Sequence, residues 1–275
     1  NGEINIDQHL HAGINEQNYE SYTKRIKESD FDNNYDLEGF FDINHTFDNQ
    51  DQEFNFSISY DIENDNEYEN LLSVNIDTTR LMQNMKTMEV DLSYKYPIND
   101  KSKMELGYDG KINANEETMD FQIENFNGEN TFFYDRSIHG FFLEYDYKLS
   151  ENISVKPSVR YEYISKDISF TSEKSGDNTA ILYAQVLSLL DDSTFVDDYS
   201  TFYPDFHFTY NITEKQSLQF GLSKRANRPG EGGHGPGSRQ IRPFPRDVYS
   251  DNFIFVGNPF LKPEYSTQYE LSFKS

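Results

Sequence analysis

The stretch Met88-Glu89-Val90-Asp91-Leu92-Ser93-Tyr94-Lys95-Tyr96 decides the fold class, because apolar and polar side chains alternate through all of it. Successive side chains of a β-strand point to opposite faces of the sheet. The even-numbered residues therefore form an apolar face and the odd-numbered residues a polar face. The stretch predicts a strand that lies between an apolar and an aqueous environment.

The same alternation recurs along the chain. It is clear at 104–112 and 153–163, and a weaker version lies near 2–10. About ten strands and no helix are predicted in this way. The remaining alternating runs are 35–47, 53–63, 137–148, 199–212, 217–226 and 265–275.

The connections between these strands alternate in length. Short polar connections such as 48–52 and 97–102 take turns with long ones, at 11–34, 64–86, 114–136, 166–198 and 227–264. In an antiparallel sheet this alternation places every short turn at one end and every long loop at the other. Strands of about 10–13 residues also have the length needed to cross a bilayer at a tilt. The pattern predicts an all-β protein, an antiparallel transmembrane β-barrel segment with short periplasmic turns and long extracellular loops.

Aromatic residues support the membrane interpretation. Pairs of them stand on the apolar face just before three of the short turns, where a membrane interface favours amphipathic rings. A soluble β-sandwich would also use aromatic residues as strand formers, but it does not explain the asymmetry of the connections. The pairs are Tyr94 with Tyr96, Tyr145 with Tyr147, and Phe208 with Tyr210.

Composition excludes several classes of protein. The chain of 275 residues has 24 Lys and Arg against 48 Asp and Glu, and a net charge of −24 has the wrong sign for a nucleic-acid binder. The absence of Cys excludes a disulfide scaffold and a thiol nucleophile. No run approaches the roughly 18 apolar residues of a membrane-spanning helix, and the longest candidate, 180–190, is too short. The first residues show neither a basic start nor an apolar core, so no signal peptide is predicted.

No catalytic residue, metal site or cofactor is predicted. Ser21-Tyr22-Thr23-Lys24 has the spacing of the penicillin-binding serine enzymes, but it lies in a polar connection and not at the start of a helix. Residues 61–67 have the acidic spacing of a calcium loop without its required Gly and terminal Glu. His9 and His11 share a strand face, but no third metal ligand is identifiable.

Residues 224–264 break the alternating pattern. They hold six of the nine Pro, six of the 15 Gly, and seven basic against four acidic residues. Pro and Gly fix and turn the backbone, so this segment is predicted to be a shaped loop. Because guanidinium groups bind carboxylates and phosphates in a bidentate manner, its cationic cluster is the best candidate for a binding site.

Short motifs in this loop resemble those of TonB-dependent outer-membrane receptors, and more narrowly of the outer-membrane β-barrel family common in Bacteroidetes. The resemblance is specific over 199–275 and general, as alternating strands, over 1–198. The Gly-rich insert at 230–237 departs from the family pattern and leaves the local loop shape open. The motif residues are Arg228, Pro229, Pro243, Phe244, Asp251, Gly257, Asn258, Pro259, Leu261, Pro263 and Glu264.

The resemblance implies a barrel of about 22 strands that surrounds an N-terminal plug and is driven by the TonB complex of the inner membrane. Residues 1–275 would then be a single partial barrel domain without the plug, and a complete ten-stranded barrel remains the alternative within this fold. The implied location is the outer membrane, with lipid, the TonB complex and a nutrient ligand as partners. The implied function is import of a scarce siderophore, vitamin, peptide or glycan. A closed ten-stranded protease or lipase and a secreted acidic β-sandwich adhesin are the alternatives.

Two sets of polar residues are expected to face the lumen of such a barrel. The loop residues would contact the substrate or the plug; they are Arg225, Arg228, Arg239, Arg242, Arg246 and Asp247. The alternative for Arg225, Arg228 and Arg242 is that they tie the loop to carboxylates inside the barrel. The polar residues of the alternating strands would line a hydrated wall. These are Glu89, Asp91, Lys95, Glu105, Asp109, Lys111, Lys156, Arg160, Glu162, Gln219, Arg225 and Glu270.

Overall fold

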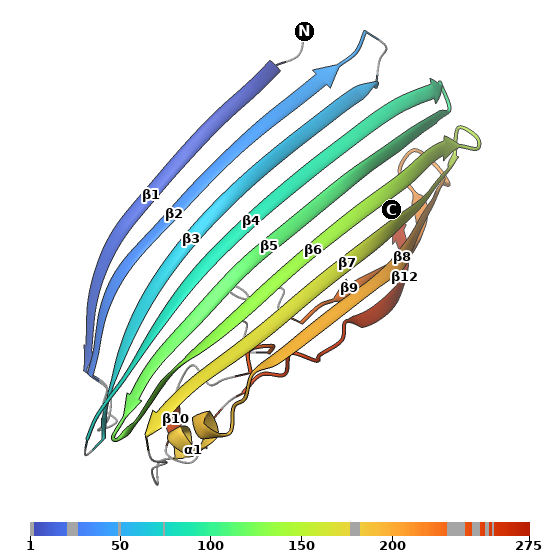
Figure 1. The fold of residues 1–275 in the computed structure, drawn as a ribbon. Helices are drawn as coiled ribbons and strands as arrows, with labels where there is room; N and C mark the ends of the chain where they lie inside the picture. The colour runs from blue at the N-terminus through green and yellow to red at the C-terminus, as the bar shows by residue number, and fades with distance from the viewer. Residues whose placement is uncertain are drawn as a thin grey trace.

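The computed structural model describes residues 3–20, 27–48, 51–73, 75–176, 182–229, 240–243, 248–250, 253–254 and 256–275. Ten of its strands form one antiparallel sheet in the order β1-β2-β3-β4-β5-β6-β7-β8-β9-β12 (Figure 1). The strands are β1 (Glu3–Glu20), β2 (Lys27–Thr46), β3 (Glu53–Ser73), β4 (Asn75–Asn99), β5 (Ser102–Ile123), β6 (Phe126–Lys148), β7 (Ile153–Gly176), β8 (Ser193–Asn211), β9 (Ser217–Asn227) and β12 (Glu264–Lys274). A separate hairpin pairs β10 (Val248–Ser250) with β11 (Phe253–Ile254).

Each strand of the large sheet pairs with its neighbours in the sequence, except that β12 joins β9 after the loop. The short connections between β2 and β3, β4 and β5, β6 and β7, and β8 and β9 all lie at one end of the sheet (Figure 1). The one helix among the described residues, α1 (Leu182–Ser188), lies at the opposite end (Figure 1). The predicted all-β architecture, with its two unlike ends, is confirmed.

The strands are longer than the alternation predicted. Strands β3 to β7 have 21, 25, 22, 23 and 24 residues, well beyond 10–13. Most of the predicted loops 64–86 and 114–136 are therefore continuous hairpins, the second of which turns at Glu124 with a φ of 53°. Their backbone groups keep pairing with each other beyond the membrane, because pairing satisfies them as well in water as in lipid.

A change of phase explains why the extensions were missed. In the half of β5 next to the short turn, the exposed apolar residues are even-numbered, as in Leu106 and Ile112. In the half of β5 that lies toward the α1 end of the sheet, the apolar residues are odd-numbered and buried: Met119, Phe121 and Ile123. The apolar face thus switches from the outer to the inner side of the sheet along one strand. Lipid covers the outer side of the sheet only within the membrane. Where the strands extend beyond the membrane, their outer side faces water, so apolar side chains are buried on the inner side.

The helix is a second correction to the prediction of no helix. The predicted loop 166–198 contains the end of β7, α1 and the start of β8. The helix spans seven residues and its Leu187 is fully buried, which places the helix against the sheet. Neither end carries a charged residue that would mark a helix terminus in the sequence.

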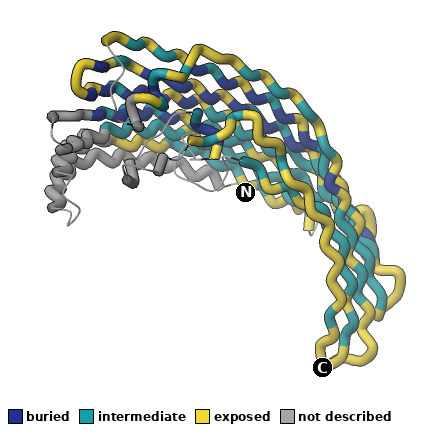
Figure 2. The backbone as a smooth tube through the Cα atoms, turned by 90° about the horizontal axis from the view of Figure 1, so that it is seen from below, coloured by how far each residue is buried: buried dark blue, intermediate teal, exposed yellow. Residues whose placement is uncertain are grey.

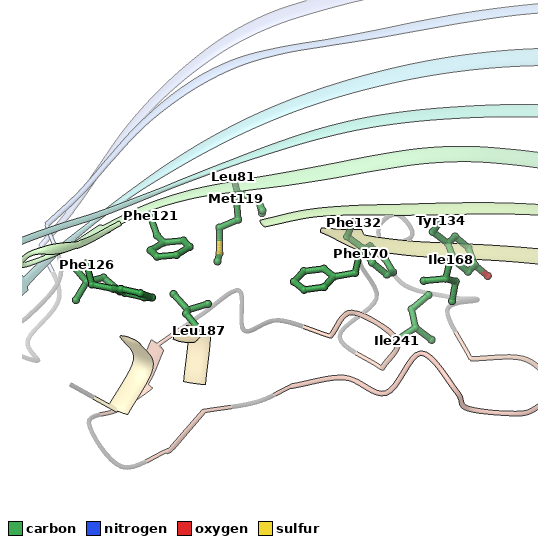
Figure 3. Close-up of a cluster of buried hydrophobic side chains, with 11 residues drawn as sticks. Leu81, Met119, Phe121, Phe126, Phe132, Tyr134, Ile168, Phe170, Leu187 and Ile241 are labelled. Carbon is green, nitrogen blue, oxygen red and sulfur yellow. The ribbon is translucent and has the colours of Figure 1, made fainter. Parts of the chain in front are cut away.

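The sheet is curved like part of a cylinder wall (Figure 2). Its apolar core lies on the side that carries α1 and Ile241, and Figure 3 shows Met119, Phe121 and Phe132 pointing from the strands toward Leu187 and Ile241. The other members of this core are Leu81, Ile123, Phe126, Tyr134, Ile168 and Phe170. The opposite, outer side keeps apolar residues exposed, including Leu92, Phe141, Leu143, Val159 and Leu271. This exposed apolar band lies on the face that the sequence predicted to contact lipid.

Strand register places all twelve polar wall residues on the inner face. Glu89 lies opposite Lys111, and the Nζ atom of Lys111 is 2.5 Å from the Glu89 carboxylate. Lys95 lies 3.6 Å from Glu53 in the same way. The same register carries the face across the sheet through β7 and β9 to β12. The register therefore agrees with the prediction that these residues share one face, and a hydrated lumen lining stays a prediction.

Gly107 marks a close approach between strands of this wall. A Cβ atom at this position would lie 2.5 Å from the carbonyl oxygen of Leu92 and would overlap the Phe142 ring. We therefore expect Gly107→Ala to destabilise the barrel by about 1–3 kcal/mol, because the backbone of Leu92 would have to shift. Gly39→Ala is the matched control, since nothing lies within 4 Å of its new Cβ atom. Urea unfolding of both variants in detergent measures the difference, and equal midpoints would contradict the expectation.

Candidate functional site: the arginine loop and the inner wall

The structure describes three of the six predicted binding residues of the loop. These are Arg225, Arg228 and Arg242, whereas Arg239, Arg246 and Asp247 lie outside the described residues. Of the motif residues, Phe244 and Asp251 also lie outside them. Arg225 is exposed on β9, opposite Ser266 of β12, and forms no ion pair with a residue that the structure describes. The geometry of the site therefore rests on Arg228 and Arg242.

Arg242 binds a carboxylate inside the apolar core. Its Nη1 atom is 2.5 Å from Oε1 of Glu117, and the two residues are 2% and 1% exposed. The second oxygen of Glu117 accepts a hydrogen bond of 2.7 Å from the amide of Gln83. Because the neighbouring residue Ile241 belongs to the apolar core, the ion pair is shielded from water. Such a desolvated ion pair fixes the position of the loop, and removing one partner lowers the stability of the fold because it leaves a buried charge unpaired.

The motif Gly257-Asn258-Pro259 fixes the backbone of the same segment. The N–H of Gly257 donates to the carbonyl of Arg242 at 2.8 Å, and the N–H of Asn258 donates to the carbonyl of Gln240 at 2.7 Å. The side-chain oxygen of Asn258 then accepts the N–H of Phe260 at 2.9 Å. Two motifs that are 15 residues apart in the sequence thus form one small paired unit, as Gly257 and Arg242 show.

Arg228 joins a second group of charges on the inner wall, nearer the short turns than Glu117. Its Nη2 atom binds one oxygen of Glu162 and also lies 3.1 Å from the Tyr203 hydroxyl. The other Glu162 oxygen accepts a hydrogen bond of 2.7 Å from Nε of Arg160, whose two terminal nitrogens bind Asp109. The network links β5, β7 and β8 to the start of the loop. Arg228 and Arg242 are therefore bound to inner-wall carboxylates, as the second of the two predicted interpretations expects.

A third charged group lies on β7 beyond its membrane-spanning part, where the buried Ile164 and Ile168 flank Lys166 on the inner face. The carboxylate of Asp197 is 2.7 Å from the Lys262 Nζ and 4.0 Å from the Lys166 Nζ, and both ammonium groups lie over the ring of Phe195. Lys166 is 8% exposed. Burial lowers the pKa of Lys166, and the positive charges of Lys262 and Arg136 lower it further against the opposing effect of Asp197.

This lowered pKa gives a pH-dependent prediction. Charged Lys166 destabilises the folded state at neutral pH, and the destabilisation is lost as pH rises toward the lysine pKa of the unfolded chain. We expect Lys166→Met to stabilise the barrel by about 1 kcal/mol at pH 7 and by progressively less at alkaline pH. Urea midpoints measured from pH 7 to pH 10.5 check this, with Lys111→Met as the control at an exposed ion pair. A gain that grows with pH would contradict the assignment.

The described residues contain no group of three or more His, Asp or Glu side chains placed to hold a metal ion. Strand register pairs His9 with Glu38 and His11 with Asp36. Among the described residues, no helix is both long enough and apolar enough to span a membrane.

Comparison with known proteins identifies the family. The sequence profile of the outer membrane protein beta-barrel family matches residues 45–275. The chain belongs to this family. The match reaches further toward the N-terminus than the motif-bearing region 199–275 that suggested it. A member of this family is a protein of the outer membrane, and the outer apolar band of the sheet is consistent with contact to lipid.

The chain resembles parts of longer chains of known structure. The ferric yersiniabactin uptake receptor FyuA from Yersinia pestis superposes with a TM-score of 0.58 at 10% identity, over 89% of this chain and 34% of that one. The RagAB peptide importer gives a TM-score of 0.39 at 10% identity, over 92% and 45% of the two chains. The hemophore receptor HasR from Serratia marcescens gives 0.36 at 10% identity, over 98% and 56%. The chain thus spans about a third to just over half of these proteins. No curated protein matches it in sequence.

Proposed function

We propose that this chain forms part of the barrel wall of a TonB-dependent receptor that imports a scarce nutrient across the outer membrane. The observation that supports this most strongly is the motif loop between β9 and β12, which is bound to the inner face of the sheet through Arg228 and Arg242. A loop that is tied inward occupies the space through which a ligand would pass. The fold shared with FyuA, an uptake receptor, supports the same class of function.

The nutrient is proposed to be a siderophore, vitamin, peptide or glycan, and a plug domain is proposed to close the barrel and to connect it to the TonB complex. The inner wall suits a hydrated path, because its charges are paired across strands as in Lys156 with Glu144 at 2.7 Å. FyuA, which shares this fold, is an uptake receptor, so a transporter is proposed in preference to the outer-membrane enzyme or the adhesin.

The test is energy-dependent uptake by cells that carry or lack the gene for the full-length protein. Four labelled probes are compared: a ferric siderophore, cobalamin, a peptide mixture and a glycan mixture. We expect one probe to accumulate at least about tenfold faster with the gene, and a protonophore to abolish the difference because TonB-driven transport needs an energised inner membrane. Uptake that persists with the protonophore would indicate a passive pore. Equal uptake of all four probes in both strains would also contradict the proposal.

A further inference from the structure

The inner wall carries its charges unevenly. In β2, β3 and β4, residues 35–46, 53–63 and 87–97 contain eight Asp or Glu and one Lys, and strand register places all nine on the inner face. The corresponding residues of β5, β6 and β7, at 103–111, 140–148 and 154–162, contain five acidic and five basic residues on the same face. We call the inner face of β2 to β4 the acidic arc.

Neighbouring residues leave most of this negative charge in place. Two of the eight carboxylates have a lysine partner: Glu53 lies 3.6 Å from Lys95, and Glu89 lies 2.5 Å from Lys111 of β5. Asp42 forms no ion pair with a residue that the structure describes. The strand on the far side, β1, contains no Lys or Arg in residues 3–20. The acidic arc therefore has a surplus of negative charge that a positively charged ligand would complement.

The acidic arc contains a hollow of about 450 Å³. Its lining includes the inner-face carboxylates of Asp42, Asp91 and Glu105 and the aromatic ring of Phe142. The ring extends from β6 across β5, because Gly107 has no side chain there; a Cβ atom at Gly107 would lie 2.4 Å from the ring. Carboxylates bind ammonium and guanidinium groups through charge-assisted hydrogen bonds, and an aromatic ring attracts the same cations. The hollow thus combines two kinds of group that recognise an organic cation.

The spacing of the carboxylates favours an organic cation over a metal ion. Asp42, Asp91 and Glu105 come from three different strands, and the described residues contain no group of three or more His, Asp or Glu placed to hold a metal. A divalent metal ion needs several oxygen ligands that converge on one point. A peptide with several basic side chains presents separate charges along its length, which suits carboxylates that are spread over three strands.

We propose that the acidic arc binds basic peptides, with one ammonium or guanidinium group in the hollow beside Asp42, Asp91 and Phe142. This inference rests on the proposed transport function and names its substrate class among the candidate nutrients. An anionic ligand would meet like charge along the whole arc, so the same surface selects against it.

The experiment measures binding of three labelled hexapeptides to the purified full-length protein in detergent. Each peptide alternates tyrosine with one other residue, which is lysine, serine or glutamate, and carries the same uncharged dye for fluorescence polarisation. We expect the lysine peptide to bind at least about tenfold more tightly than the serine peptide at low salt, and the glutamate peptide to bind most weakly. The preference should shrink as salt is added, because salt screens the charges.

Variants of the hollow locate the binding. We expect the double variant Asp42→Asn with Asp91→Asn to weaken binding of the lysine peptide by about tenfold and to leave the serine peptide unchanged. Phe142→Leu keeps an apolar side chain but removes the ring, and should weaken the lysine peptide by about threefold. Asp205→Asn is the control, because Asp205 is an inner-face carboxylate on β8 that lies 3.0 Å from His207. It should change the affinity by less than about twofold. Heat-modifiable gel mobility shows that each variant has assembled.

The outcomes separate this inference from the transport function. Equal affinity for the lysine and serine peptides would overturn it, as would an equal loss in Asp205→Asn, which would assign the binding to the net charge of the chain. Displacement of the lysine peptide by calcium at constant ionic strength would indicate a metal site instead. If the lysine peptide binds as expected but cells take up no peptide, the acidic arc stands and the proposed transport function fails. If cells take up peptides without any preference for basic ones in binding, transport stands and this inference fails.

Discussion

Arg242→Leu is expected to destabilise the folded barrel by about 3–5 kcal/mol, because it leaves the buried carboxylate of Glu117 without its cationic partner. Glu117 is 1% exposed, and Gln83 alone would then hydrogen-bond it. Water can solvate this carboxylate only if Ile241 leaves the apolar core, and exposure of Ile241 and the core lowers stability as well. Urea unfolding of the full-length protein in lipid vesicles, followed by tyrosine fluorescence, measures the effect.

The double variant Arg242→Leu with Glu117→Leu is the matched control. Removing both charges replaces the ion pair with apolar side chains inside an apolar core, and such replacements are often neutral or stabilising. We expect the double variant to recover most of the stability that Arg242→Leu loses. If the double variant is as unstable as the single one, the loss comes from the packing of residues 240–243 and not from an unpaired carboxylate.

Leu92→Arg is expected to cost about 2–4 kcal/mol, because it places a charge on the lipid-facing side of β4 near the middle of the membrane-spanning stretch. Leu92 is 37% exposed on the outer face, five residues before the Pro97 that precedes the short turn. A guanidinium group there has no polar partner within the lipid. Heat-modifiable mobility and urea midpoints of the purified protein in lipid report the loss.

Ser93→Arg tests the adjacent position on the inner face. Ser93 accepts a hydrogen bond of 3.3 Å from Asn55 on that face, where the wall is polar and hydrated. We expect Ser93→Arg to change stability by less than about 1 kcal/mol. Equal costs at positions 92 and 93 would mean that neither side of β4 faces lipid.

Strict alternation predicted the membrane-spanning part of the sheet well. Residues 88–96 lie within β4, and the partners of Val90 and Leu92 in β3 are the apolar Ile58 and Phe56. Within the membrane one face meets lipid along the whole strand, so the pattern has a single phase. The alternation in the sequence is regular because the environment of each face does not change along this part of the strand.

The halves of the hairpins that lie toward the α1 end of the sheet could not be predicted from strict alternation. Met119, Phe121 and Ile123 do alternate, but in the opposite phase to Leu106 and Ile112 on the same strand. A strand that passes from lipid into water changes the face it buries, and a rule that requires one phase assigns such a strand end to a loop. The extension would have been found by allowing one inversion of phase per strand.

The arginine loop was predicted as a charged and shaped segment, but its partners were not. Glu162 was expected on the inner wall without a partner in the loop, and Glu117 was not singled out at all. Position 117 falls within the predicted loop 114–136, so its place on the inner face became visible only with the register of β5. Partners that lie 66 and 125 residues away from each other leave no local signal in the sequence.

We expect the apolar side of the sheet to touch lipid and the polar side to enclose an aqueous lumen. Spin labels on single Cys residues at positions 88 to 96 of the full-length protein in vesicles test it directly, with oxygen as the lipid-soluble relaxing agent and a nickel chelate as the water-soluble one. We expect the even positions to respond to oxygen and the odd positions to nickel, with a period of two. A uniform response along the stretch, or the reverse alternation, would contradict it.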